Sequence, residues 1–111
     1  MGGFFDMQVV DYEQMERATR RVVAGKNLML VYVEREAGSV RAEHSHPNEQ
    51  IIYLLEGRAK FRLGDEEREV EAGQAMHVEP DLVHQVDALT DIRYLGIYSP
   101  PREEIISGKE G

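Results

Sequence analysis

Three of the four histidines in this sequence are spaced as a metal site requires. His44 and His46 are separated by one residue, so in a β-strand both side chains leave the same face. Gln50 has the same parity and opens the next predicted strand, whereas Glu49 has the opposite parity and is expected to point away. His84 directly follows a predicted turn and can face the first pair across a barrel. Neutral imidazole is the commonest metal ligand, so His44, His46, Gln50 and His84 form a candidate site for one divalent cation.

A histidine pair of this kind is a weak signal by itself, because surface pairs and buried structural histidines are common. The sequence contains no cysteine, which excludes disulfides, thiolate zinc sites and a cysteine nucleophile. Any metal must therefore be held by imidazole, carboxylate or amide groups. The remaining histidine, His77, lies between Met76 and Val78 in a predicted strand, and we interpret it as a structural or interface residue.

Short strands must position these side chains, because the apolar residues recur mostly with a period of two. Residues 58–63 alternate apolar and basic side chains strictly, as a half-buried strand does. Turn signals recur about every 8–12 residues, which is typical of an all-β sandwich or barrel. The predicted strands cover residues 20–24, 28–36, 40–44, 50–55, 58–63, 67–71, 74–79, 84–89 and 92–98.

The sequence also predicts two helical turns, a polar tail and a central strand. One helical turn is predicted around 11–19, with Asp11 as its cap, and another at 101–106. Residues 107–111 resemble a frayed polar tail. The segment 28–33 is apolar on both faces, so we expect a central strand covered by the second sheet and a loop or by a partner subunit.

Individual side chains outside the histidine cluster are assigned by the same pattern. Arg20 and Arg21 are expected at a solvated strand end. The core or pocket lining is expected to include Ile52, Leu54, Phe61, Met76 and Tyr94.

The length of 111 residues allows one domain. We expect a single domain over 1–111, with N-terminal strands in 4–24, the barrel in 28–98 and a C-terminal tail in 99–111. A chain this short has a thin margin of stability, so a homodimer is the expected assembly.

Net charge and hydropathy limit the classes of molecule that the protein is expected to bind. The net charge of −8 argues against nucleic-acid binding but permits an anionic small molecule in a buried site. No run approaches the ~18 apolar residues of a membrane span. The N-terminal residues lack the basic region and apolar run of a signal peptide, so a cytoplasmic location is the expectation.

The residues around the histidines resemble the motifs of the cupin family. The first cupin motif, which spaces a glycine, the histidine pair, an acid and a second glycine, is matched by Gly38, His44, His46, Gln50 and Gly57. The second motif begins at Gly73 and ends at His84. The resemblance implies an RmlC-like double-stranded β-helix, or jelly-roll barrel. It also implies one divalent metal ion (zinc, nickel, manganese, iron or cobalt) at the three histidines and Gln50.

Within that family the chain is similar to the pectin-degradation group, small cupins that open unsaturated monouronic sugars to linear keto forms. Residues 44–51 and 98–104 carry this likeness. In that group an aromatic residue and an arginine at the positions of Tyr98 and Arg102 lie near the substrate. The resemblance therefore implies that Arg102 binds a uronate carboxylate and that Tyr98 contributes packing or a hydroxyl. The group's catalytic aspartate falls at Gly96, which cannot carry a proton.

Gln50 stands where most cupins have a metal-binding glutamate. Three histidines and an amide leave the full charge on the metal, which favours Lewis-acid chemistry and anionic ligands. We therefore expect a metal-dependent isomerase, lyase or cyclase acting on a small anionic carbohydrate-like metabolite. Two alternatives remain open: a three-histidine iron dioxygenase, and a non-catalytic cupin that binds a metal or ligand, which Gly96 favours.

Overall fold

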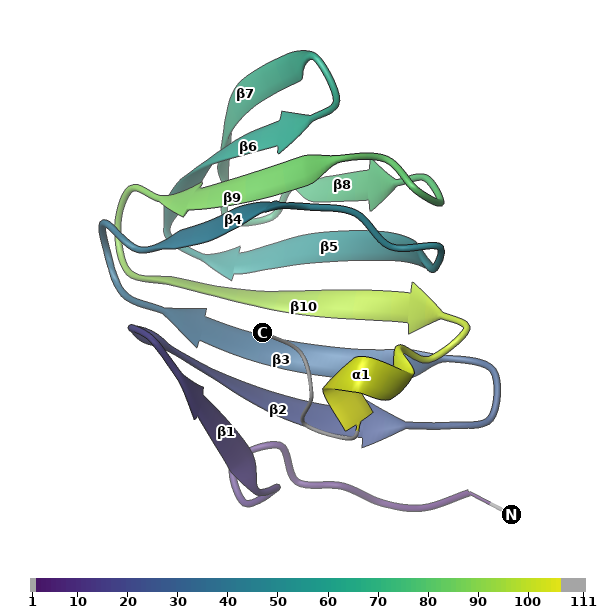
Figure 1. The fold of residues 1–111 in the computed structure, drawn as a ribbon. Coiled ribbons are helices and arrows are strands. Elements are labelled where there is room, and N and C mark those ends of the chain that lie inside the picture. Colours follow the sequence, from purple (N-terminus) through teal and green to yellow (C-terminus); the bar gives the residue numbers. More distant parts are fainter. Residues whose placement is uncertain (1, 107–111) are drawn as a thin grey trace.

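The computed structural model describes residues 2–106, which form two antiparallel sheets facing each other and a short helix (Figure 1). The six-stranded sheet has the order β1-β2-β3-β10-β5-β8, and the four-stranded sheet has the order β4-β9-β6-β7. This arrangement confirms the expected all-β jelly-roll barrel. The elements are β1 (Tyr12–Met15), β2 (Ala18–Ala24), β3 (Met29–Arg35), β4 (Val40–His44), β5 (Glu49–Glu56), β6 (Arg58–Leu63), β7 (Glu66–Glu71), β8 (Ala75–Val78), β9 (His84–Ala88), β10 (Ile92–Ser99) and α1 (Glu103–Ile106).

Alternating burial along the strands identifies the face that turns inward. In β10, Ile92, Tyr94 and Tyr98 are buried, while Arg93 and Ile97 between them are exposed. β5 and β3 show the same alternation. The interior is therefore built from every second residue, as period-two patterning requires.

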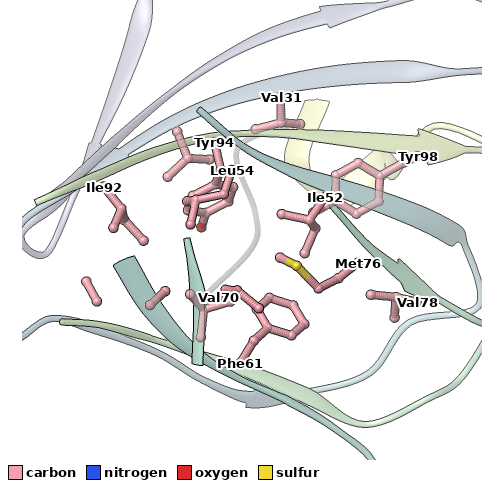
Figure 2. Packing of buried hydrophobic residues seen from close by; sticks show 14 of the residues in the cluster. Val31, Ile52, Leu54, Phe61, Val70, Met76, Val78, Ile92, Tyr94 and Tyr98 are labelled. Carbon is pink, nitrogen blue, oxygen red and sulfur yellow. The ribbon is translucent and has the colours of Figure 1, made fainter. Parts of the chain in front are cut away.

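Apolar side chains from both sheets meet between them. Figure 2 shows Ile52 and Leu54 opposite Phe61 and Val70, with Met76 beside them. All the residues expected from the sequence to be core or pocket lining are at least nine-tenths buried. Removing this apolar area from water is the main stabilising term for the barrel.

Gly57 joins β5 to β6 with φ +86°, a left-handed backbone that L side chains rarely adopt. A Cβ atom there would lie 2.2 Å from the carbonyl oxygen of Asp91 and 2.5 Å from Oγ1 of Thr90. Only glycine fits this position, which places the start of β6 against the start of β10.

The N-terminal part of the chain differs from expectation. The helical turn predicted around 11–19 is wrong, because β1 and β2 pair there as an antiparallel hairpin. Strand β2 also pairs with β3 along its whole length, and this pairing outweighs the local capping signal of Asp11. Residues 4–11 contain turns rather than the expected strand.

The other predicted segments keep their places. Strand β3 lies between β2 and β10, so the apolar segment 28–33 contains a central strand as expected. The predicted helical turn at 101–106 is observed as α1. The predicted tail at 107–111 lies outside the described residues. Within residues 2–106, no helix is long and apolar enough to cross a membrane.

Candidate metal centre

Two strand ends and a loop bring the histidines together. His44 closes β4, His84 opens β9, and the two residues are direct partners in the ladder between these strands. Their ring centroids are 4.1 Å apart, and the ring of His46, in the loop after β4, lies 4.9 Å from that of His84. The possible ligand atoms of the three residues all lie within 4.8 Å of one another. This is the arrangement of donors around a single cation.

Backbone carbonyls hold the three imidazole rings in one tautomer. Each ring donates a hydrogen bond from Nδ1 to a carbonyl two residues away: His44 to Ala42 (2.8 Å), His46 to Asn48 (3.0 Å) and His84 to Leu82 (2.8 Å). Each Nε2 atom therefore carries the free lone pair, as in metal-bound histidines whose other nitrogen is fixed by a hydrogen bond.

The Nε2 atom of His84 is the strongest sign of a missing partner. It is buried and has no hydrogen-bond partner, although leaving a buried acceptor unsatisfied is costly. A cation at the centre of the three rings would satisfy it. The residues present therefore fit a divalent metal ion.

Gln50 extends this donor set. Its Oε1 atom lies 3.0 Å from Nε2 of His46. Because Nδ1 of His46 carries the proton, two lone pairs face each other at this contact, and a shared cation would make it favourable. Two ligands at right angles, each ~2.1 Å from a metal, are about 3.0 Å apart. The contact has this spacing.

Glu49 and His77 lie on the outer face of the sheet. Nε2 of His77 lies 2.6 Å from Oε2 of Glu49, and both side chains are more than half exposed. The expectation that Glu49 points away from the site is confirmed, and His77 lies outside the barrel.

Burial keeps the imidazoles of His44 and His84 neutral. Desolvation, together with the nearby positive charge of Arg41, lowers the pKa of His44 to about 3. Desolvation also lowers the pKa of His84. Neutral imidazole is the form that binds metals, so at neutral pH these ligands need no deprotonation.

Tyr98 and Arg102 lie beside the histidines. The ring of Tyr98 packs 5.4 Å from that of His46, and the guanidinium of Arg102 lies 5.6 Å from the centroid of the Tyr98 ring. Arg102 is buried and donates from Nε to Oε1 of Glu104 (2.8 Å). Both residues line the same pocket as His44, Gln50 and His84.

Gly96 leaves room for its neighbours in this pocket. A Cβ atom there would lie 3.2 Å from Nε2 of Gln50 and 3.2 Å from Cε2 of Tyr98. The position supplies space for the amide of Gln50 and offers no acidic group. A glycine in a strand often marks a close approach of this kind.

Sequence reasoning missed three arginines of the pocket. Arg20, expected at a solvated strand end, is only 5% exposed and lines the pocket, so that expectation is wrong. It pairs with Val33 in the ladder between β2 and β3 and therefore turns inward. Arg35 and Arg41 line the pocket too. Their parity with inward-facing neighbours was the signal, but it is readable only once the inward face of each strand is known.

Comparison with known proteins gives a consistent result. The sequence profile of the family described as "Cupin domain" matches residues 31–98. The structure of KdgF from Halomonas sp. superposes with a TM-score of 0.89 at 27% identity, covering 95% of this chain and 99% of that chain. An RmlC-like cupin from Shewanella frigidimarina superposes with a TM-score of 0.89 at 21% identity, covering 95% of this chain and 96% of that one. An uncharacterized protein of Streptomyces coelicolor is 25% identical over 77 residues, or 68% of this chain and 73% of the relative.

Proposed function

This chain belongs to the cupin family and resembles its KdgF group, and from that premise we propose that it is a metal-dependent isomerase, lyase or cyclase. Its substrate would be a small anionic carbohydrate-like metabolite. The observation that carries the proposal is the cluster of three imidazoles, in which the buried Nε2 atom of His84 lacks a hydrogen-bond partner, in a pocket lined by arginines. The cluster suits a cation, and the arginines suit the negative charge of the substrate.

Four side chains would hold the metal: His44, His46, His84 and Gln50. One divalent ion (zinc, nickel, manganese, iron or cobalt) fits this neutral donor set. When bound, such an ion supplies Lewis-acid polarisation of a substrate oxygen. The amide of Gln50 adds a donor without a negative charge.

Arg102 would orient the substrate. Its planar guanidinium suits a two-pronged contact with a carboxylate, and burial beside Tyr98 strengthens that contact. The ion pair with Glu104 holds the arginine side chain in place while the 43% exposed carboxylate stays near the surface.

The proton transfer that ring opening needs would use Tyr98. Gly96 offers no acid, Glu43 is exposed and paired with Arg62, and Glu79 is exposed. The ring of Tyr98 is buried against His46, and the residue lines the pocket. A phenol next to a metal site can carry a proton to or from a polarised substrate oxygen.

Elemental analysis of the protein as isolated, followed by assays with a panel of unsaturated monouronates, tests the proposal. We expect a stoichiometric divalent metal and turnover that drops at least about 100-fold in Tyr98→Phe. The matched control is Tyr53→Phe, an exposed tyrosine on the outer face, which should keep full activity. Turnover that is unchanged in Tyr98→Phe would contradict the role of the phenol.

Two other functions would each give a different experimental result. A three-histidine iron dioxygenase would contain iron and consume oxygen in the presence of substrate, which an oxygen electrode measures directly. A non-catalytic metal- or ligand-binding cupin is favoured by Gly96 and would bind small acids without converting any of the panel. Each result would replace the isomerase or lyase proposal.

We further propose that the chain forms a homodimer through the outer face of the six-stranded sheet. Apolar side chains gather there across three neighbouring strands, since Ile97 pairs with Ile51 on one side and Leu30 on the other. Ile51 and Ile97 are 46% and 41% exposed. An apolar face of this kind is a usual site of association.

Sedimentation of the purified protein at micromolar concentration tests the dimer. We expect a dimer for the wild type and for Val40→Lys, a control at a 50% exposed residue of the other sheet. Ile97→Lys should give a monomer, because it places a charge within the apolar face. A monomeric wild type would contradict the proposal.

A further inference from the structure

The metal-site pocket has an unusual charge distribution. Its lining contains no Asp or Glu among the described residues, although the whole chain carries a net charge of −8. Four arginines line it instead: Arg20, Arg35, Arg41 and Arg102. Positive charge is therefore concentrated in the one cavity where a cation is also expected to bind.

Strand register separates these arginines into two places. Met29 pairs with Tyr98, which lies beside Arg102 and the histidines, whereas Arg35 pairs with Ile92 at the opposite end of the same ladder. At ~3.3 Å per residue, the backbones of these two positions are about 20 Å apart. Arg35 therefore enters the pocket from the strand end opposite to Tyr98, and the long arginine side chain shortens that separation. Arg20 pairs with Val33 and lies between the two ends.

The arginines differ in how their charge is balanced. Arg20 is paired with Glu13, with Nη2 to Oε2 at 2.8 Å, and Arg102 is paired with Glu104. Arg41 is half-buried, and its charge contributes to the lowered pKa values of His44 and His84. Of the three fully buried arginines of the pocket, Arg20 and Arg102 are therefore balanced by carboxylates.

Arg35 is the exception. It is 6% exposed, and its Nε atom is buried without a hydrogen-bond partner. Across residues 2–106 the structure gives its guanidinium no ion pair. Glu34, its neighbour in β3, has the opposite parity and is exposed. Burying a guanidinium without a carboxylate or hydrogen bonds is costly, so its retention at this position points to an anion supplied from outside the chain.

We propose that Arg35 is a specificity-determining residue that binds a second acidic group of the ligand, which is therefore a short dicarboxylate. This inference rests on the proposed function in taking the pocket as the substrate site. One carboxylate would be bound at the histidine end by Arg102, and the other would meet the guanidinium fork of Arg35. Arginine is the side chain best shaped for such two-pronged carboxylate contacts.

The size of the pocket supports a compact ligand. The cavity volume is about 40 Å³, which is room for a few water molecules, since one water needs roughly 10–15 Å³ on this measure. Two acidic groups joined by a short carbon chain match this space better than a bulky sugar chain does. The second acidic group would supply the partner that the buried Nε atom of Arg35 lacks.

Calorimetric titration of the protein as isolated with acetate, malonate, succinate, glutarate and inorganic phosphate tests the proposal. We expect one of the dicarboxylates to bind at least about 10-fold more tightly than acetate, because hydrogen bonds to a second charged group are worth about 10- to 100-fold in affinity. The optimum chain length in the series measures the span between the two arginine contacts.

Two variants assign the effect to Arg35. Arg35→Gln should reduce dicarboxylate affinity to the level of acetate while leaving acetate binding unchanged. Arg58→Gln, which removes the same charge from an exposed ion pair with Glu69, should change neither. Arg35→Lys keeps the charge but not the fork, and we expect an intermediate loss. Circular dichroism verifies that each variant is folded, and Arg35→Lys supplies the test if Arg35→Gln does not fold.

Three outcomes would overturn the inference. They are equal affinity for acetate and every dicarboxylate, unchanged dicarboxylate affinity in both Arg35 variants, and an Arg35-dependent affinity for inorganic phosphate alone. Failure of the proposed function gives a different result. Dicarboxylates would then bind in an Arg35-dependent manner, but the protein would convert neither these dicarboxylates nor the monouronates of the panel.

Discussion

The two ends of the pocket place buried nitrogen atoms in opposite roles. At the histidine end, burial lowers the pKa of His44 and His84, so the rings stay neutral and present lone pairs. Away from the histidines, Arg20 and Arg35 are also buried but cannot lose their protons, so they remain cations with N–H donors. The same low-dielectric barrel thus presents lone pairs suited to a cation at one place and N–H donors suited to an anion at another, because the two kinds of side chain respond differently to desolvation.

The hydrogen-bond partners sharpen this contrast. Each clustered histidine has its Nδ1 proton bound to a main-chain carbonyl, which fixes the ring before any ligand arrives. Arg20 and Arg102 are held by carboxylates at the margin of the pocket, whereas Arg35 has an unsatisfied Nε atom. The histidine end is organised by the backbone, and the arginine end is balanced in part by side chains.

The largest expected effect is the loss of the metal when the histidine end is broken. His46→Ala should lower metal affinity by more than about 100-fold, since even residues behind the ligands contribute 10- to 100-fold. Circular dichroism should show an intact fold because His46 lies in a loop, not in a strand ladder. The control is His77→Ala on the outer face. Elemental analysis that finds stoichiometric metal in His46→Ala would show that the ligand set is wrong.

A second prediction changes the anion contact beside the histidines. Arg102→Gln should weaken acetate binding by about 10- to 100-fold, because it removes a charge-assisted contact, and should leave metal content unchanged. Calorimetry and elemental analysis on the same preparation measure both quantities. If metal content fell together with acetate affinity, Arg102 would also be needed for metal binding. This would contradict the separation of the metal ligands from the anion contact.

A third prediction uses pH on the metal-free protein. His44 has a folded-state pKa of about 3, below its ordinary value of 6.5, so the unfolded chain binds a proton that the folded chain does not. Stability contributed by this group is full above pH 6.5 and is lost as the pH falls from 6.5 toward 3. Thermal unfolding across this range should therefore show a smaller decline in midpoint for His44→Gln than for the wild type. Parallel curves for the two proteins would contradict the expectation.

The smallest effect is expected at Gly96. Gly96→Ala places a methyl group 3.2 Å from the Gln50 amide and the Tyr98 ring, which is a tight contact that a small side-chain shift relieves. We expect a loss in metal affinity of about five-fold or less, which corresponds to ~1 kcal/mol, the low end of what overpacking costs. Competition with a chelator measures it. If Gly96→Ala lowered metal affinity as much as His46→Ala does, displacement of the Gln50 amide would be as damaging as the loss of a histidine ligand.

Much of the fold was predictable because strand patterning is local. Residues 58–63 alternate apolar and basic side chains and form β6, and the strand predicted at 92–98 lies within β10. The hairpin of β1 and β2 was not predictable in the same way. Every residue of β1 is exposed or half-buried, and the pairing of β2 with β3 outweighs the local preferences of these residues.

The candidate site was also predictable from the sequence only in part. Strand parity predicted that Gln50 and not Glu49 faces the site, because successive side chains of a strand alternate sides. It does not account for the position of His46, which lies in the loop after β4. Only the tertiary structure decided that His84 is the ladder partner of His44 and that Arg20 and Arg35 turn into the same cavity. The physical reason is that the inward face of a strand is set by long-range pairing with other strands, and burial, with its effect on charge, follows from that pairing.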